Sequence, residues 1–212
     1  MKLPFNKALI LAPHTDDGEF GCGGLISRLI REEAEVMYIA FSDCKESVPE
    51  GFAKDILGRE LKAATQFLGI KSCNLRLLDY KVRYFTDERQ QILEDLVKIG
   101  KEFNPDLILT PCTMDVHQDH SSITKEAIRA YKNTTILGYE LPWNNLQLPS
   151  DGIIVLEEKD IENKIHAIAK YESQKGRAYS SPEFIKSLAI TRGTRIREKY
   201  AEAFEVIRMV FK

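Results

Sequence analysis

The chain has 212 residues, of which 43% are hydrophobic, and its formal net charge is −2 at pH 7. This length is enough to bury a sizeable apolar core, and the composition excludes a disordered chain. The near-neutral charge, with basic residues spread along the sequence, excludes an electrostatic binder of nucleic acid or of an anionic membrane surface, and we expect neither partner.

Short apolar runs alternate with longer amphipathic stretches as far as residue 140. The pattern predicts strands that are buried on both faces and helices with one apolar face. In chain order we expect strand 8–11, helix 23–33, strand 36–41, helix 52–67, strand 75–78, helix 87–103, strand 107–109, helix 121–131 and strand 135–139.

The pattern is less regular in the last third of the chain. There we expect strand 152–156, helix 160–171, loop and helix within 173–195, and a final strand at 203–211. Alternation of strands and helices predicts an α/β fold with a mainly parallel sheet. The doubly wound strand order 3-2-1-4-5 would place the first and fourth strands side by side, with a cleft at their carboxyl ends. We expect one domain over residues 1–212, with a core at 7–140 that residues 141–212 complete.

Three of the four histidines follow the first or the fourth predicted strand, and carboxylates accompany them. The sequence HTDD occupies residues 14–17, and HQDH occupies residues 117–120. A lone histidine or a pair of aspartates in a loop is more often structural. Two such clusters after neighbouring strands predict a single site at the carboxyl edge of the sheet.

Two histidines and one carboxylate are typical of a catalytic metal site that keeps a position open for water. We predict His14, Asp17 and His120 as the ligands, with Zn²⁺ as the ion and Fe²⁺ as the other ion that suits this ligand set. A divalent ion lowers the pKa of water toward about 7, and Asp16 beside it is the predicted general base.

The second cluster offers further groups for catalysis. His117 would stabilise an oxyanion or protonate a leaving amine, and Asp119 would orient a neighbouring imidazole. His166 has no carboxylate near it in sequence and is expected to be a surface or packing residue.

Other readings of the same region are weaker. Glycines at 18, 21, 23 and 24 do not match the GxGxxG fingerprint, so we expect no dinucleotide cofactor. They are expected to allow close packing of the helix on the sheet. The four cysteines form no CxxC pair, which disfavours a zinc finger, and surrounding carboxylates would raise a thiol pKa, which disfavours a cysteine nucleophile.

The runs APHTDDGEFGCGG and HQDH resemble the N-acetylglucosaminyl deacetylase family, also called PIG-L or LmbE-like. The segments LGRELKAATQFLGI, ILGYELPWNN and KIHAIAKYESQ are also similar to connecting regions of its members, so the resemblance extends from Lys7 to about Gln174. It implies a Rossmann-like three-layer sandwich and a zinc-dependent amidohydrolase that removes N-acetyl groups.

The resemblance also implies roles for single residues. The family's metal ligands match His14, Asp17 and His120, and its general base matches Asp16. The histidine that stabilises the transition state or transfers a proton matches His117, and its partner matches Asp119. An arginine that binds substrate in some members matches Arg59. Trp143 would either stack on a sugar ring or serve the core or an interface.

The sequence departs from the family pattern at three places. Thr15 stands where proline is usual, so the turn would be less constrained, and Gly18 stands where glutamate is frequent, which would alter support of the metal. Met114 and Asp115 occupy the stretch where some members have a tyrosine, so oxyanion stabilisation would depend more on His117 and the metal.

We therefore expect a hydrolase that removes the N-acetyl group from an amino sugar or its conjugate, a small-molecule substrate. The alternatives are a non-haem Fe(II) oxygenase using the same ligands, and a sugar-binding protein without catalysis. No apolar run approaches the roughly 20 residues of a membrane span, and the N-terminus lacks a long apolar signal region. We expect a cytoplasmic protein, with a homo-oligomer as an open possibility.

Overall fold

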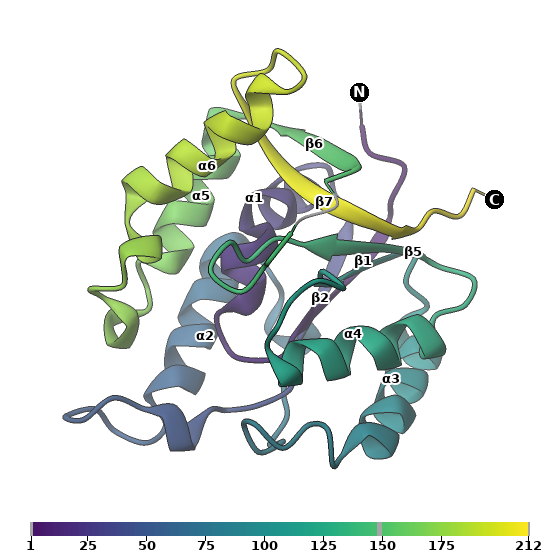
Figure 1. Ribbon diagram of the computed structural model, residues 1–212, viewed down its shortest axis with the longest axis vertical. Coiled ribbons are helices and arrows are strands. Elements are labelled where there is room, and N and C mark those ends of the chain that lie inside the picture. Colours follow the sequence, from purple (N-terminus) through teal and green to yellow (C-terminus); the bar gives the residue numbers. More distant parts are fainter. Residues whose placement is uncertain (1, 148–149, 212) are drawn as a thin grey trace.

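The computed structural model describes residues 2–147 and 150–211 and shows a seven-stranded sheet between layers of helices (Figure 1). The strand order is β3-β2-β1-β4-β5-β7-β6. The strands are β1 Lys7–Ala12, β2 Glu35–Ala40, β3 Leu75–Leu77, β4 Leu107–Pro111, β5 Thr135–Tyr139, β6 Gly152–Leu156 and β7 Tyr200–Arg208. The main helices are α1 Asp17–Arg31, α2 Ile56–Leu68, α3 Arg89–Phe103, α4 Gln118–Ala130, α5 Glu158–Ile168 and α6 Pro182–Thr194.

The first five strands are parallel and follow the predicted order 3-2-1-4-5. Successive residues of β1 point to opposite faces because side chains alternate along a strand. Ala8, Ile10 and Ala12 pack in an apolar cluster with α1, α2 and α5, whereas Leu9 and Leu11 pack in a second cluster with α3 and α4. The predicted three-layer α/β sandwich is confirmed.

The C-terminal segment enters the same sheet in the opposite direction. β7 lies between β5 and β6 and is antiparallel to both. It begins at Tyr200, three residues before the predicted strand, and α6 lies within the stretch predicted as loop and helix. Within the described part of the chain, no helix has the length and apolar character needed to cross a bilayer.

Helix α1 begins at Asp17, six residues before the predicted start, so the predicted boundary was wrong. The first turn contains acids and glycines, which show no apolar periodicity, although these residues are buried. A Cβ on Gly18 would lie 2.6 Å from the Tyr38 side chain, and one on Gly21 would lie 2.2 Å from that of Tyr139. The predicted role of the glycines in close helix–sheet packing is confirmed.

Helix α1 is kinked at Cys22, whose φ of −145° and ψ of 25° are not helical. The kink releases backbone N–H groups of the next turn, and buried groups of this kind need new acceptors. The Glu202 carboxylate of β7 accepts from Gly24 N at 3.0 Å and from Leu25 N at 2.8 Å. The C-terminal strand thus fixes the helix that carries the first motif.

Candidate metal and active site

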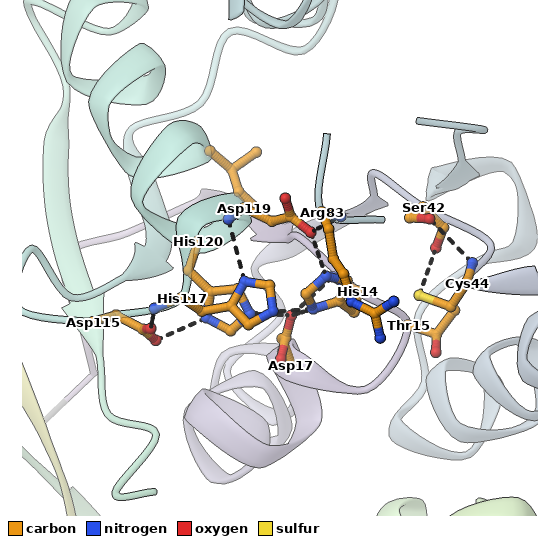
Figure 2. Close-up of polar contacts among 12 residues, drawn as sticks. His14, Thr15, Asp17, Ser42, Cys44, Arg83, Asp115, His117, Asp119 and His120 are labelled. Carbon is orange, nitrogen blue, oxygen red and sulfur yellow. Dashed lines mark hydrogen bonds and ion pairs between the residues drawn. The ribbon is translucent and has the colours of Figure 1, made fainter. Parts of the chain in front are cut away.

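Both histidine–aspartate motifs lie at the carboxyl edge of the sheet, where β1 and β4 are neighbours. The HTDD residues follow β1 and lead into α1, and the HQDH residues open α4 (Figure 2). His117 caps α4, because its Nδ1 accepts a hydrogen bond from the Asp119 backbone N–H at 3.2 Å. The structure therefore brings together the two clusters that are about 100 residues apart in sequence.

Three donor atoms converge at the centre of this region. His14 Nδ1, His120 Nε2 and Asp17 Oδ2 are each 3.2 Å from the other two. In a tetrahedral zinc site with bonds of about 2.0–2.1 Å, neighbouring ligand atoms lie about 3.3–3.4 Å apart. The separation and the chemistry of the donors fit one face of such a site.

The remaining nitrogen of each ring contacts a carboxylate. His14 Nε2 lies 3.0 Å from Asp119 Oδ2, and His120 Nδ1 lies 2.7 Å from Asp115 Oδ2. With a metal bound, these contacts would keep the ring protons on the outer nitrogens and direct the inner lone pairs at the ion, as in carboxylate–histidine–metal arrangements. The resemblance pairs Asp119 with His117, whereas its carboxylate here contacts His14.

Asp115 received no role in the sequence analysis. The sequence shows only that Asp115 lies in the same loop, five residues before His120. Spacing alone does not tell which histidine ring its carboxylate contacts. In the fold it is buried, and it also accepts the His117 backbone N–H at 2.8 Å.

The charges of the site favour a cation. Burial by itself would lower the pKa of both rings, but Asp17 and the outer carboxylates reverse the effect, raising the pKa of His14 to about 9 and that of His120 to about 10. Burial would raise the pKa of Asp17, but the two imidazoles hold it well below its usual range. A buried carboxylate between two imidazoles therefore stabilises positive charge here, which a divalent ion would supply.

A second donor set includes His117 in place of Asp17. The donor atoms of His14, His117 and His120 lie within 4.8 Å of one another. We favour the set with Asp17, because its separations are shorter and it supplies a negative charge, while His117 Nδ1 already accepts from a backbone amide.

Asp16 and His117 line the same cleft, and their pKa values are shifted in opposite directions. Burial and the adjacent Asp17 raise the pKa of Asp16 to about 6, against the opposing charges of Arg177 and His14. Burial and the two neighbouring imidazoles lower the pKa of His117 below its usual value. At neutral pH Asp16 is mainly a carboxylate, and His117 is a neutral ring whose proton lies on Nε2, because Nδ1 accepts.

A buried polar cluster holds the turn that carries the first motif. The Tyr171 hydroxyl donates to the Thr15 carbonyl at 2.6 Å and lies 3.0 Å from Glu19 Oε1, and the Tyr38 hydroxyl lies 2.5 Å from Glu19 Oε2. Burial raises the pKa of Glu19 to about 8, so its neutral form prevails at pH 7. The turn is thus constrained by tertiary contacts although Thr15 replaces the usual proline.

The site opens into a cleft of about 280 Å³. Trp143 contributes to its wall and stacks on Tyr179, with ring centroids 3.8 Å apart and an interplanar angle of 16°. Gln174 also lines the cleft, and its buried Oε1 has no hydrogen-bond partner among the described residues. The sequence analysis missed Gln174, which lies in the irregular segment before α6.

The predicted substrate residue Arg59 lies apart from this cleft. Helix α2 contributes Leu57 to the cleft wall. The Arg59 side chain is 58% exposed and pairs with Asp55, four residues earlier, at 3.2 Å.

The cysteines do not provide a nucleophile. All four thiols are free, and Cys22, Cys44 and Cys112 are buried. Burial raises the pKa of Cys112 to about 11 and that of Cys22 well above its usual value, so both remain protonated at neutral pH.

Comparison with known proteins identifies the family. The model of the PIG-L family, described as GlcNAc-PI de-N-acetylase, matches residues 9–131, which is more than half of the chain. The chain belongs to the PIG-L family. The match contains both motifs and all the candidate metal donors. The family model therefore covers the part of the chain that builds the candidate metal site.

Two of the similar proteins are diacetylchitobiose deacetylases. Diacetylchitobiose deacetylase of Thermococcus kodakarensis is 28% identical over 132 residues, which are 55% of this chain and 47% of that protein. The aligned region thus spans about half the length of that relative. The solved diacetylchitobiose deacetylase of Pyrococcus horikoshii has a TM-score of 0.79 at 22% identity and covers 95% of this chain and 83% of its own.

The fold alone does not fix the reaction. The 4-carboxy-2-hydroxymuconate hydratase GalB of Pseudomonas putida has a TM-score of 0.78 at 17% identity and covers 98% of both chains. The reaction therefore depends on the groups in the cleft and not on the fold that holds them.

Proposed function

We propose that this protein removes the acetyl group from the nitrogen of an N-acetylated amino sugar or its conjugate. The observation that carries the proposal is the triangle of His14 Nδ1, Asp17 Oδ2 and His120 Nε2, with Asp16 beside it. Membership of a family described as a de-N-acetylase supports hydrolysis of an amide over the oxygenase alternative, which needs no base at Asp16.

His14, Asp17 and His120 would hold a divalent ion, for which Zn²⁺ suits the ligands and Fe²⁺ fits the same set. An ion there would polarise an amide carbonyl and acidify water. Asp119 contacts the outer nitrogen of the His14 ring, and Asp115 contacts that of the His120 ring. The inner nitrogen of each ring therefore faces the proposed ion.

Asp16 acts as the general base. Its pKa of about 6 leaves it ionised at neutral pH yet basic enough to accept a proton from water. The protonated carboxyl then returns the proton to the leaving nitrogen, so that acetate and a free amine result.

His117 stabilises the oxyanion that forms on the former carbonyl oxygen. Its neutral ring offers the Nε2–H toward the cleft because Nδ1 is held by the Asp119 amide. A donor fixed in this way before the reaction loses little energy in reorganisation.

The cleft wall would bind the sugar. The stacked pair of Trp143 and Tyr179 offers an aromatic surface for the ring, and Gln174 Oε1 offers an acceptor for a sugar hydroxyl. Both groups belong to the cleft that contains Asp16.

Acetate release from a panel of N-acetylated amino sugars, measured with and without a chelator, tests the function. We expect release that stops with the chelator and returns with Zn²⁺ or Fe²⁺ under anaerobic conditions. Activity that requires oxygen and a reductant would establish the oxygenase instead, and sugar binding without any acetate release would leave a binding protein.

A further inference from the structure

Two arginines line the cleft that contains the metal ligands. Arg83 lies in the turn between β3 and α3, and Arg177 lies in the segment between α5 and α6. They come from separate parts of the chain, and the fold brings them to the same cleft as Asp16 and His14.

Within residues 2–147 and 150–211, neither guanidinium forms an ion pair with a carboxylate. Arg177 Nη1 donates to the Tyr179 hydroxyl at 2.6 Å. Elsewhere, Arg31 lies 2.9 Å from Asp160, and Arg192 pairs with Glu140 through two nitrogens. A guanidinium that lines a cleft and pairs with no carboxylate of the described residues is suited to bind a carboxylate or phosphate of a ligand, because its planar donors match those groups.

The backbone at Arg83 is held in a conformation that arginine rarely adopts. Its φ is +72°, in the left-handed region that favours glycine. Its N–H donates to Asp119 Oδ2 at 2.7 Å, and its carbonyl accepts from Gln118 Nε2 at 2.5 Å. These bonds fix the start of the Arg83 side chain relative to the Asp119 carboxylate, which also contacts His14 (Figure 2).

Strained backbone of this kind persists where surrounding contacts hold it, and it is concentrated at ligand sites. At position 83 the hydrogen bonds to α4 need only a backbone, which glycine would supply without strain. These contacts use only the backbone of residue 83, and they do not explain why its side chain is an arginine.

We propose that the substrate carries an anionic group, a carboxylate or a phosphate, attached to the N-acetylated sugar, and that Arg83 and Arg177 bind it. The inference rests on the proposed deacetylase function and specifies its substrate class. The acetamido group and the hydroxyls of such a sugar are uncharged, so the anion is a further substituent of the substrate.

Three probes that differ in one substituent test the inference: methyl N-acetylglucosaminide, its carboxymethyl counterpart and N-acetylglucosamine 1-phosphate. Acetate release and calorimetric binding are measured for each with the metal-replete protein. The main variant is Arg83→Asn, because asparagine tolerates a left-handed backbone. Arg83→Lys keeps the charge without the planar fork, and Arg76→Gln, which removes a surface ion pair with Glu102, is the matched control.

We expect the wild type to prefer one anionic probe over the methyl glycoside by roughly 10-fold to 100-fold in kcat/KM, as charge-assisted hydrogen bonds provide. Arg83→Asn should remove most of this preference through KM, with unchanged metal content and a much smaller change on the methyl glycoside. Arg83→Lys should retain part of it, and Arg76→Gln all of it. The preferred probe identifies the anion as carboxylate or phosphate.

Arg177 is the second position, and its guanidinium lies in the cleft wall beside Tyr179. Arg177→Gln should also raise KM for the anionic probe more than for the methyl glycoside.

Equal handling of the neutral and anionic probes by the wild type would overturn the inference, and so would an equal loss on all three probes in Arg83→Asn. Absence of binding to both anionic probes would also overturn it. Binding of an anionic probe that depends on Arg83 but yields no acetate would instead reject the deacetylase function and retain the anion site.

Discussion

The segment up to β5 and the segment after it contribute to the cleft in different ways. The first segment supplies the three proposed metal donors and the carboxylates that contact the two histidine rings, from the ends of β1 and β4. The second supplies Tyr171, Gln174, Arg177 and Tyr179, which support or line the cleft. The parallel β–α units thus hold the groups of the proposed chemistry, and the irregular C-terminal segment completes the wall of the cleft.

Removing a metal donor from the first segment should have the largest effect. Asp17→Ala should abolish acetate release and weaken metal binding by more than about 100-fold, beyond what loss of a supporting group costs. Elemental analysis and a deacetylation assay measure the two effects. Normal metal content and normal activity in a folded Asp17→Ala protein would reject this donor assignment.

His117→Ala should be slow but metal-loaded. Loss of one oxyanion donor lowers kcat by about 100-fold to 1000-fold, or about 3 kcal/mol in the barrier. Steady-state kinetics with parallel metal analysis would measure it. If metal content fell together with kcat, His117 would be a ligand, as in the three-histidine donor set.

Asp115→Asn tests a residue that sequence reasoning missed. Loss of the carboxylate behind the His120 ring should weaken metal affinity by about 10-fold to 100-fold. Asp106→Asn is the control, because the Asp106 carboxylate also accepts backbone N–H groups, at Asn6 and Lys7. Competition with a metal indicator measures affinity, and an equal loss in both variants would remove the specific role of Asp115.

The pKa values of His14 and His120 predict how pH acts on the protein without metal. They are about 9 and about 10 in the fold, above the ordinary 6.5, so the protonated rings contribute stability that is fully present below pH 6.5. This contribution is lost as the pH rises through 9 to 10. Thermal unfolding of chelator-treated protein should therefore show a falling Tm over that window.

Metal binding should show the opposite trend, because a cation must displace both ring protons. Affinity for Zn²⁺ should rise about tenfold per pH unit for each proton released. Calorimetry at pH 7 in two buffers of different ionisation enthalpy counts the protons, and binding without proton release would contradict the raised pKa values.

Tyr171→Phe should have the smallest effect and tests the second segment. Loss of the hydroxyl that holds the Thr15 carbonyl should cost about 1–2 kcal/mol of stability and lower activity by a few-fold. Tyr131→Phe is the matched control, because its buried hydroxyl donates to the Leu96 carbonyl at 2.8 Å on the α3–α4 side. The two variants should lose similar stability in denaturant titrations, and only Tyr171→Phe should change kcat.

Much of the fold followed from apolar periodicity. The run at β1 and the amphipathic helices predict buried strands and helix faces, and both are observed. The start of α1 was misplaced because the acids and glycines of its first turn look like a loop, although they are buried against the sheet. The antiparallel insertion of β7 between β5 and β6 has no local signal, since strand pairing depends on contacts far apart in sequence.

By itself, the sequence determined that two histidine–aspartate clusters follow strands that lie side by side, because strand order and local spacing are encoded in short segments. Only the tertiary structure decided which carboxylate faces each ring, with Asp119 at His14 and Asp115 at His120. It also placed Tyr171 on the Thr15 carbonyl, 156 residues away in sequence. The physical reason is that a hydrogen bond depends on positions within a few tenths of an ångström, and packing of the whole chain sets those positions.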